Sequence, residues 1–365
     1  NLQFLTFLVN AIVAVDRHAD LLRASIASAG NDHRLGANEA PPAIISVFLG
    51  QQLSAVLDEL EKVESGKLSP EQKTELKLNV VGKIPEILLD NTDRNRTSPF
   101  AFTGNKFEFR AVGSAANCAQ SMTVLNTIVA NQLFEFKKSV DSLIEQGLKK
   151  DDALFNVLRD LISTSHKVRF EGDGYSEDWK NEAAKRGLSN LPDTPRALKA
   201  YVSESSKALF EKLNILNHIE LEARYDILLE DYFKKIQIES RTLGDLVTNH
   251  ILPTAMNYQA QVAEGALKLK SLYDERTFAQ LAKPQLDLVT ELGNRIHILS
   301  SEVSAMTEAR KVANKIEDPE ARAVAYCDSV KPHFETIRYH VDKLELSVDN
   351  ALWPLPKYRE MLYAR

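Results

Sequence analysis

The sequence predicts an α+β fold, with helices around one short β-hairpin in the first part of the chain and a mostly α-helical second part. Residues 97–112 alternate weakly between apolar and polar side chains, and Thr103-Gly104-Asn105 interrupts them as a tight turn would. After Asn117, almost every segment carries apolar residues at helical spacing. Because one hydrophobic core rarely serves more than about 300 residues, two domains are expected, at residues 1–168 and 169–365.

The first helix is predicted from the most apolar window of the chain. Apolar residues recur at helical spacing through residues 1–28, and Gly30 follows as a helix stop. The window has no basic residues ahead of its apolar run and is too short to span about 30 Å of hydrocarbon. It therefore predicts a buried helix rather than a signal peptide. Residues 30–42 are rich in Gly, Asn, Asp and Pro and predict a loop.

Two helices and the hairpin are expected after this loop. Residues 47–62 carry Leu and Val at helical spacing, and Ser69-Pro70 is a typical helix start with proline at the first helical position. In the second strand of the hairpin, Phe107 and Phe109 share one face, since successive side chains of a strand point to opposite sides. The other face then carries three charged side chains, those of Lys106, Glu108 and Arg110.

The second part of the chain is predicted to be a series of amphipathic helices. They occupy residues 120–144, 151–166, 177–186, 195–214, 219–240, 242–273, 276–315 and 319–350. The last of them carries apolar side chains at alternating three- and four-residue steps, namely Phe334, Ile337, Val341, Leu344 and Val348. Such a seam must be buried, either against another subunit or within its own chain.

Composition excludes several classes of partner. The 45 basic and 51 acidic residues give a net charge of −6 without a basic cluster, so we expect no nucleic-acid partner, and no apolar run predicts a membrane partner. Cys118 and Cys327 are too few for a disulfide framework and indicate a reducing, cytoplasmic setting. The histidines His166, His250, His297, His333 and His340 show no metal-ligand spacing along the sequence.

Motifs in the first third of the chain carry the chemistry. They read R-L-G-A-N-E-A-P-P-A-I at residues 34–44, N-R-T-S-P-F at 95–100, F-E-F-R at 107–110 and G-S-A-A-N at 113–117. In this order they resemble the motifs of glutamine synthetases, and most closely those of the long type III branch. The resemblance implies that the chain corresponds to the C-terminal half of such an enzyme. It would comprise part of the α+β catalytic domain, with a helical insertion at about 48–90, followed by a helical C-terminal domain.

The resemblance implies ATP-dependent ligation of glutamate and ammonia to glutamine through a γ-glutamyl phosphate. Arg34 and Arg110 match positions that hold the glutamate substrate, and Arg96 matches a catalytic position that stabilises the transferring phosphoryl group. Guanidinium groups suit both tasks because their fixed donors engage carboxylate and phosphate oxygens and they stay charged.

The remaining implied roles concern the intermediate and the cofactors, which are ATP and Mg²⁺ or Mn²⁺. Glu39 matches a catalytic flap residue that closes over the intermediate and helps accept a proton from ammonium, a role that suits a mobile loop. Glu108 matches a metal ligand, and Lys106 a position that contacts the nucleotide. The resemblance also implies a ring-forming homo-oligomer.

Each of these residues could instead have a purely structural role. From spacing alone, isolated arginines are solvated or form structural ion pairs, Glu39 is an exposed loop carboxylate, and Glu108 is an ion-pair partner of Arg110. Ala101 departs from the family pattern, which commonly has a second phosphate-binding arginine there. Two other functions also remain possible: another carboxylate–amine ligase on the same scaffold, or a helical assembly protein with a catalytic remnant.

Overall fold

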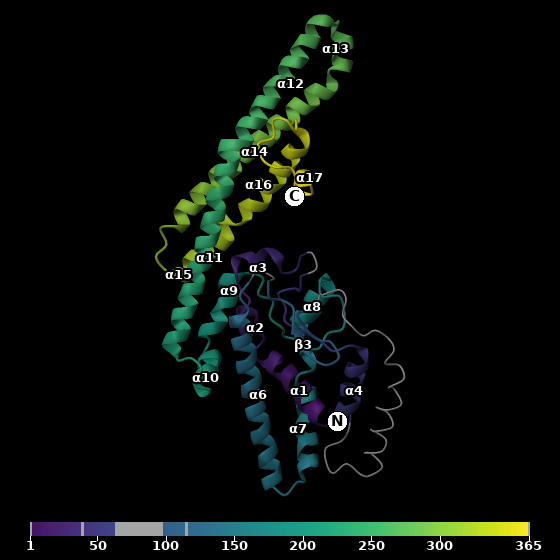
Figure 1. Cartoon of the computed structure of the whole chain (residues 1–365), viewed down its shortest axis with the longest axis vertical. Coiled ribbons are helices and arrows are strands. Elements are labelled where there is room, and N and C mark those ends of the chain that lie inside the picture. Colours follow the sequence, from purple (N-terminus) through teal and green to yellow (C-terminus); the bar gives the residue numbers. More distant parts are fainter. Residues whose placement is uncertain (1, 38–39, 63–97, 114–115, 364–365) are drawn as a thin grey trace. The chain divides into compact units, whose positions relative to one another are not determined.

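The computed structural model describes residues 2–37, 40–62, 98–113 and 116–363 (Figure 1). By its internal contacts the chain divides into two compact units, Asn1–Leu228 and Leu229–Arg365. The first ends later than the predicted domain boundary at residues 168–169. Within the described ranges, no helix combines the length and apolar character that crossing a membrane would require.

The N-terminal segment of the first unit forms three helices rather than the single predicted one. They are α1 (Leu2–Arg17), α2 (Ala19–Ala24) and α3 (Ala29–Arg34). Gly30 lies inside α3, so its prediction as a helix stop was wrong. The physical reason is Ser28, whose hydroxyl accepts a hydrogen bond from the Asn31 backbone N–H at 3.2 Å and so starts a new helix. The predicted loop therefore begins only after Arg34.

A three-stranded sheet contains the predicted hairpin. Strands β2 (Phe100–Phe102) and β3 (Phe107–Phe109) pair antiparallel, with Phe100 opposite Phe109 and Phe102 opposite Phe107. Gly104 has a backbone φ of 97° in the turn between them, a value that residues with a side chain rarely adopt. The hairpin prediction is confirmed.

The third strand, β1 (Val47–Phe48), pairs parallel with β2 and was not predicted. Val47 is fully buried, and Gly50 has a φ of 84°, so the chain turns before helix α4 (Gln51–Glu61) begins. The prediction of a helix from residue 47 was wrong in its first residues, since buried apolar residues next to a glycine suit a strand end as well as a helix start. The helix predicted at Ser69-Pro70 lies outside the described residues.

Helices α1, α6 (Ala119–Glu145) and α7 (Lys150–Thr164) pack against one another and supply much of the core of the first unit. Their buried contacts include Ile12 and Ile128, each 1% exposed or less. A buried polar link joins two of them, because the Gln132 amide donates to Asn10 Oδ1 at 2.9 Å. The two predicted helices after Asn117 are confirmed.

The rest of the first unit consists of short helical segments. They are η2 (His166–Val168), α8 (Glu177–Lys185), α9 (Thr194–Leu198), η3 (Lys199–Val202), α10 (Glu204–Lys212) and the first part of α11 (His218–Leu246). The segment predicted as one helix at 195–214 is broken, because Ser203 accepts a hydrogen bond from the Ser206 backbone N–H and caps α10 as a new helix.

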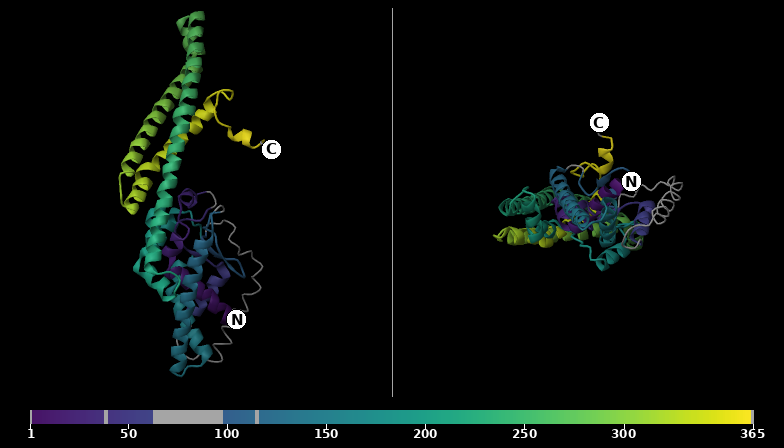
Figure 2. Two further views of the ribbon diagram at one scale, coloured as in Figure 1. Left: turned by 60° about the vertical axis from the view of Figure 1, so that its left-hand side comes forward. Right: turned by 90° about the horizontal axis from the view of Figure 1, so that it is seen from below.

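The second unit is helical wherever it has regular structure. After α11 come η4 (Val247–Ile251), α12 (Leu252–Leu272), α13 (Glu275–Leu281), α14 (Lys283–Ala313), α15 (Pro319–Ala325), η5 (Tyr326–Val330), α16 (Pro332–Ser347) and α17 (Tyr358–Met361). Within this unit α14 packs on both α12 and α16, and Figure 2 shows α12 and α14 as a long pair. Both η4 and η5 are π-helical turns that end two residues before a proline, Pro253 and Pro332 respectively. A widened turn relieves the clash between the proline ring and the carbonyl of the residue four positions earlier.

The apolar seam of the last long helix is buried within the second unit. Ile337 and Leu344 are fully buried, and α16 packs against α14 and η5. Of the two alternatives left open by the sequence, packing within the chain is therefore the one observed.

Candidate active site

Arg34 is held at the end of α3 by two hydrogen bonds. Its Nε donates to Asn31 Oδ1 at 2.9 Å, and its Nη2 donates to the carbonyl of Ala111 at 2.6 Å. The Asn31 amide donates to the same carbonyl at 3.1 Å and to the carbonyl of Ile26 at 2.7 Å. Since Ala111 directly follows Arg110, and Arg110 directly follows β3, these bonds bring Arg34 to the end of that strand.

Glu108 on β3 and the two charged residues that flank this strand form a chain of ion pairs. Lys106 Nζ lies 3.3 Å from Glu108 Oε1, and Arg110 Nε lies 3.2 Å from Glu108 Oε2. Burial acts to raise the pKa of the Glu108 carboxyl, but the hydrogen bonds and charges of Lys106 and Arg110 outweigh it and lower this pKa below its ordinary value. Glu108 is thus an anion between two cations, which also agrees with its interpretation as a structural partner of Arg110.

We call Arg34 together with this strand face the arginine edge; its members are Arg34, Lys106, Glu108 and Arg110. Its net charge is positive, because three cations face one carboxylate. The Arg34 Nη1 group donates to no described residue. A positively charged edge with fixed guanidinium donors can bind a carboxylate or a phosphate.

A buried ion pair fixes the helix that ends at Arg34. Asp32 accepts hydrogen bonds from the backbone N–H and the hydroxyl of Thr194, at 3.0 and 2.6 Å, and so ties α3 to α9. Arg23 lies 3.8 Å from Asp32, and both side chains are at most 1% exposed. Burial lowers the pKa of the Arg23 guanidinium, while the charges of Asp32 and Asp193 act against this.

Comparison with known proteins connects the chain to a family. A family model described as the glutamine synthetase C-terminal domain matches residues 153–270. The whole chain aligns with "Glutamine synthetase" of Bacteroides fragilis (strain YCH46) at 53% identity, "Type-3 glutamine synthetase" of Dictyostelium discoideum at 41%, and "Glutamine synthetase" of Butyrivibrio fibrisolvens at 34%. This chain belongs to the glutamine synthetase family. The alignments cover 50%, 49% and 50% of those proteins, so the chain spans about half the length of these curated relatives.

Membership of the glutamine synthetase family confirms the resemblance drawn from the motifs but does not test the role of any single residue. Glu39 and Arg96, the two residues predicted to be catalytic, lie outside the described residues. Ala101, where many glutamine synthetases have a phosphate-binding arginine by the resemblance above, is fully buried in β2 opposite Glu108. Its small side chain therefore supplies core packing and no charge.

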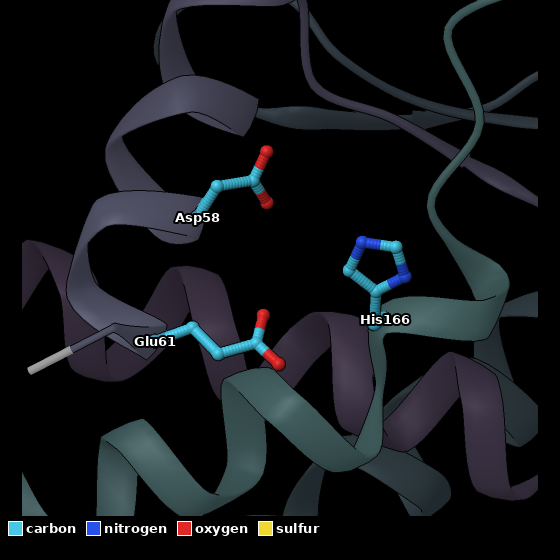
Figure 3. A group of neighbouring side chains, drawn as sticks. All are labelled: Asp58, Glu61 and His166. Atoms are coloured by element: carbon cyan, nitrogen blue, oxygen red, sulfur yellow. The ribbon is translucent and has the colours of Figure 1, made fainter.

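The glutamine synthetase motifs do not reveal two features that the structure shows. One is Asn31, which positions Arg34 and stands three residues before it, at the spacing of one helical turn. The other is a group formed by Asp58, Glu61 and His166 (Figure 3). His166 shows no metal-ligand spacing along the sequence, because its neighbours in the structure come from a distant segment. The only sequence sign of this group was the pair of carboxylates three residues apart on α4.

Proposed function

We propose that this chain forms part of the active site of an enzyme that joins glutamate and ammonia to glutamine using ATP, through a γ-glutamyl phosphate. The observation that carries the proposal is the contact of the Arg34 guanidinium with the Ala111 carbonyl, which places two arginines of separate family motifs at one strand end. The names of the relatives and their identity over the whole chain support the same activity.

In this proposal the arginine edge binds glutamate. The reaction develops negative charge on the substrate, and a rigid, positively charged surface offsets it without reorganising. Arg34 and Arg110 hold substrate carboxylate groups, and Lys106, whose side chain is 65% exposed, can reach a nucleotide phosphate. Arg96 stabilises the phosphoryl group during transfer and Glu39 accepts the proton from ammonium, as the family motifs imply.

The described residues do not form a complete site for Mg²⁺ or Mn²⁺ at Glu108. Such ions take about six oxygen ligands. Here Glu108 offers one carboxylate, and each of its oxygens already contacts a cationic side chain. Among the described residues, no other histidine, cysteine or carboxylate completes a three-ligand group with it. Glu108 alone therefore does not suffice to hold a divalent cation in the part of the chain that the structure describes.

We further propose that the enzyme assembles as a ring-forming homo-oligomer. Most of the α16 seam is already buried within its own unit. The proposed assembly would use other faces of the protein. Its test is the mass of the full-length protein by light scattering.

Steady-state kinetics of the full-length protein that carries this chain test the proposed activity. Arg110→Ala should raise the KM for glutamate about 10- to 100-fold, because losing a charge-assisted hydrogen bond costs about 1.5–3 kcal/mol. Arg96→Ala should instead lower kcat, since phosphoryl charge develops in the transition state. The control is Arg338→Ala, whose side chain is 72% exposed and pairs only with Asp342 one turn away among the described residues.

Two results would overturn the proposal. The first is a full-length protein that forms no glutamine from glutamate, ammonium and ATP but ligates ammonia or an amine to a different acid. The second is an Arg110→Ala variant whose kinetics equal those of the Arg338→Ala control. A protein inactive with every acid and amine, yet folded and assembled, would favour the assembly function instead.

A further inference from the structure

Asp58, Glu61 and His166 form a group of metal-ligating side chains outside the arginine edge. Their ligand atoms all lie within 4.8 Å of one another, and Figure 3 shows the two carboxylates and the imidazole directed toward a common space. Two of them come from α4 and the third from η2, so the group joins two separate parts of the first unit. None of the three side chains makes a hydrogen bond to a described residue.

The backbone holds the two parts of this group in a fixed relation. At the start of α4, the Glu171 carboxylate accepts hydrogen bonds from the backbone N–H groups of Leu49 and Gly50, at 3.1 and 2.9 Å, and from the Ser54 hydroxyl at 2.6 Å. Burial acts to raise the pKa of Glu171, against these hydrogen bonds. In the segment 166–171, Glu171 therefore binds the start of α4, and His166 lies close to the end of the same helix.

Arg169 supplies a second, independent observation. Its side chain is only 6% exposed, and its guanidinium lies 3.1 Å from Asp58 Oδ1 and 3.7 Å from Glu61 Oε2. None of its three guanidinium nitrogens makes a hydrogen bond to a described residue. Its ion pairs therefore hold the two carboxylates in place. Each carboxylate can keep one oxygen on Arg169 while its other oxygen binds an ion, and such outer contacts orient metal ligands.

We propose that Asp58, Glu61 and His166 bind one divalent transition-metal ion, and that Zn²⁺ is the ion suited to them. One imidazole and two carboxylates are common zinc ligands, whereas Mg²⁺ and Ca²⁺ prefer oxygen ligands alone. Three protein ligands leave a fourth position for water. Together with Arg169 the group carries a net charge of −1 when the imidazole is neutral, so a divalent cation is electrostatically favoured.

The three ligand atoms need to move only slightly toward one another to reach zinc-binding distances. An ion equidistant from three atoms at the 4.8 Å limit would lie about 2.8 Å from each, compared with about 2.0–2.2 Å in a zinc site. Asp58 is 48% exposed and Glu61 32% exposed, so rotation of these side chains can supply the difference. The bound ion would then tie the end of α4 to η2.

Calorimetric titration of the metal-free full chain with Zn²⁺ tests the proposal. We expect one site in the wild-type chain, at least a tenfold loss of affinity in Asp58→Asn and in His166→Ala, and no site of this kind for Mg²⁺. The matched control is His250→Ala, which removes an exposed histidine and should leave the affinity unchanged. Zn²⁺ should also raise the melting temperature of the wild-type chain, and less so that of the two variants.

X-ray absorption of the zinc complex identifies the ligands directly. The expected spectrum contains only nitrogen and oxygen neighbours, whereas a sulfur neighbour would assign the ion to a cysteine such as the exposed Cys118 and overturn the proposal. Equal zinc affinity in the wild type and in His166→Ala would overturn it as well. Asp58→Asn keeps the side-chain volume, so its circular dichroism without metal separates lost binding from lost folding.

Discussion

Replacing Asp32 with alanine should destabilise the first unit and displace Arg34. The carboxylate of Asp32 is fully buried and joins α3 to α9 through two hydrogen bonds to Thr194. Its removal also leaves the Arg23 guanidinium buried without its nearest counter-charge. Losing the hydrogen bonds and losing the counter-charge both lower the stability of the first unit.

The expected loss of unfolding free energy is about 3–5 kcal/mol. Breaking a buried ion pair from one side typically costs this much, since the remaining charge is left uncompensated. The two hydrogen bonds to a charged acceptor, at about 1.5–3 kcal/mol each, independently give a similar range. Arg23 keeps its Nε hydrogen bond to the Leu191 carbonyl at 2.9 Å, so part of its hydrogen bonding survives.

Urea denaturation followed by tryptophan fluorescence can measure this loss in the first unit alone. The chain has two tryptophans, the buried Trp179 in the first unit and Trp353 in the second. A Trp353→Phe background removes the second signal, and the Trp353 indole N–H makes no hydrogen bond to a described residue that this change would break. The matched control is Asp226→Ala, an exposed aspartate that should change stability by less than about 0.5 kcal/mol.

A double variant completes the test. Arg23→Met combined with Asp32→Ala removes both charges, so it should cost less than the sum of the two single variants. If Asp32→Ala destabilises the protein no more than Asp226→Ala does, the buried pair contributes little and the reasoning is refuted. Additive costs in the double variant would likewise show that the two charges do not interact.

Two further predictions concern burial. Leu344→Ala should lower the unfolding free energy of the second unit by about 2–5 kcal/mol, because Leu344 is fully buried. Leu346→Ala on the same helix should change it by less than about 0.5 kcal/mol, because Leu346 is 79% exposed. Trp353 fluorescence during denaturation measures both losses, and equal losses would contradict the packing of α16. Burial raises the pKa of Asp16 against the charge of Lys167, so its ionised form weakens the fold above that pKa. Asp16→Asn should therefore raise the melting temperature at neutral pH, and this gain should shrink as the pH falls through the raised pKa of Asp16. A gain that does not depend on pH would show that the burial of the ionised carboxylate is not its cause.

The elements that the sequence predicted well are those defined by local patterns. The hairpin follows from alternation and the turn residues Gly104 and Asn105, and α6 and α7 follow from sustained helical spacing. The breaks between helices were less predictable. Ser28 and Ser203 each cap a new helix inside a segment that was predicted as one continuous helix or as its end. The local sequence around a serine does not show whether it caps a new helix or lies within a continuous one.

Contacts between distant segments were beyond sequence reasoning of this kind. Strand β1 is only two residues long, and its place in the sheet depends on pairing with β2. The approach of His166 to Asp58 and Glu61 likewise depends on how residues 166–171 pack against α4. The family motifs predicted roles for Arg34, Lys106, Glu108 and Arg110, but they gave no indication of the neighbours that position these side chains.

The helix that carries Arg34 shows why those neighbours matter. Helix α3 has six residues, and helices shorter than about 12 residues are barely stable alone, so tertiary contacts must hold it. Asn31 binds the carbonyl of Ala111, Asp32 binds Thr194, and Arg34 binds Ala111 as well. Three of its six side chains thus anchor it to two distant segments. A change at Asp32, which lies on the α9 side, should therefore alter the position of Arg34 at the strand end, and with it the glutamate affinity of the proposed site.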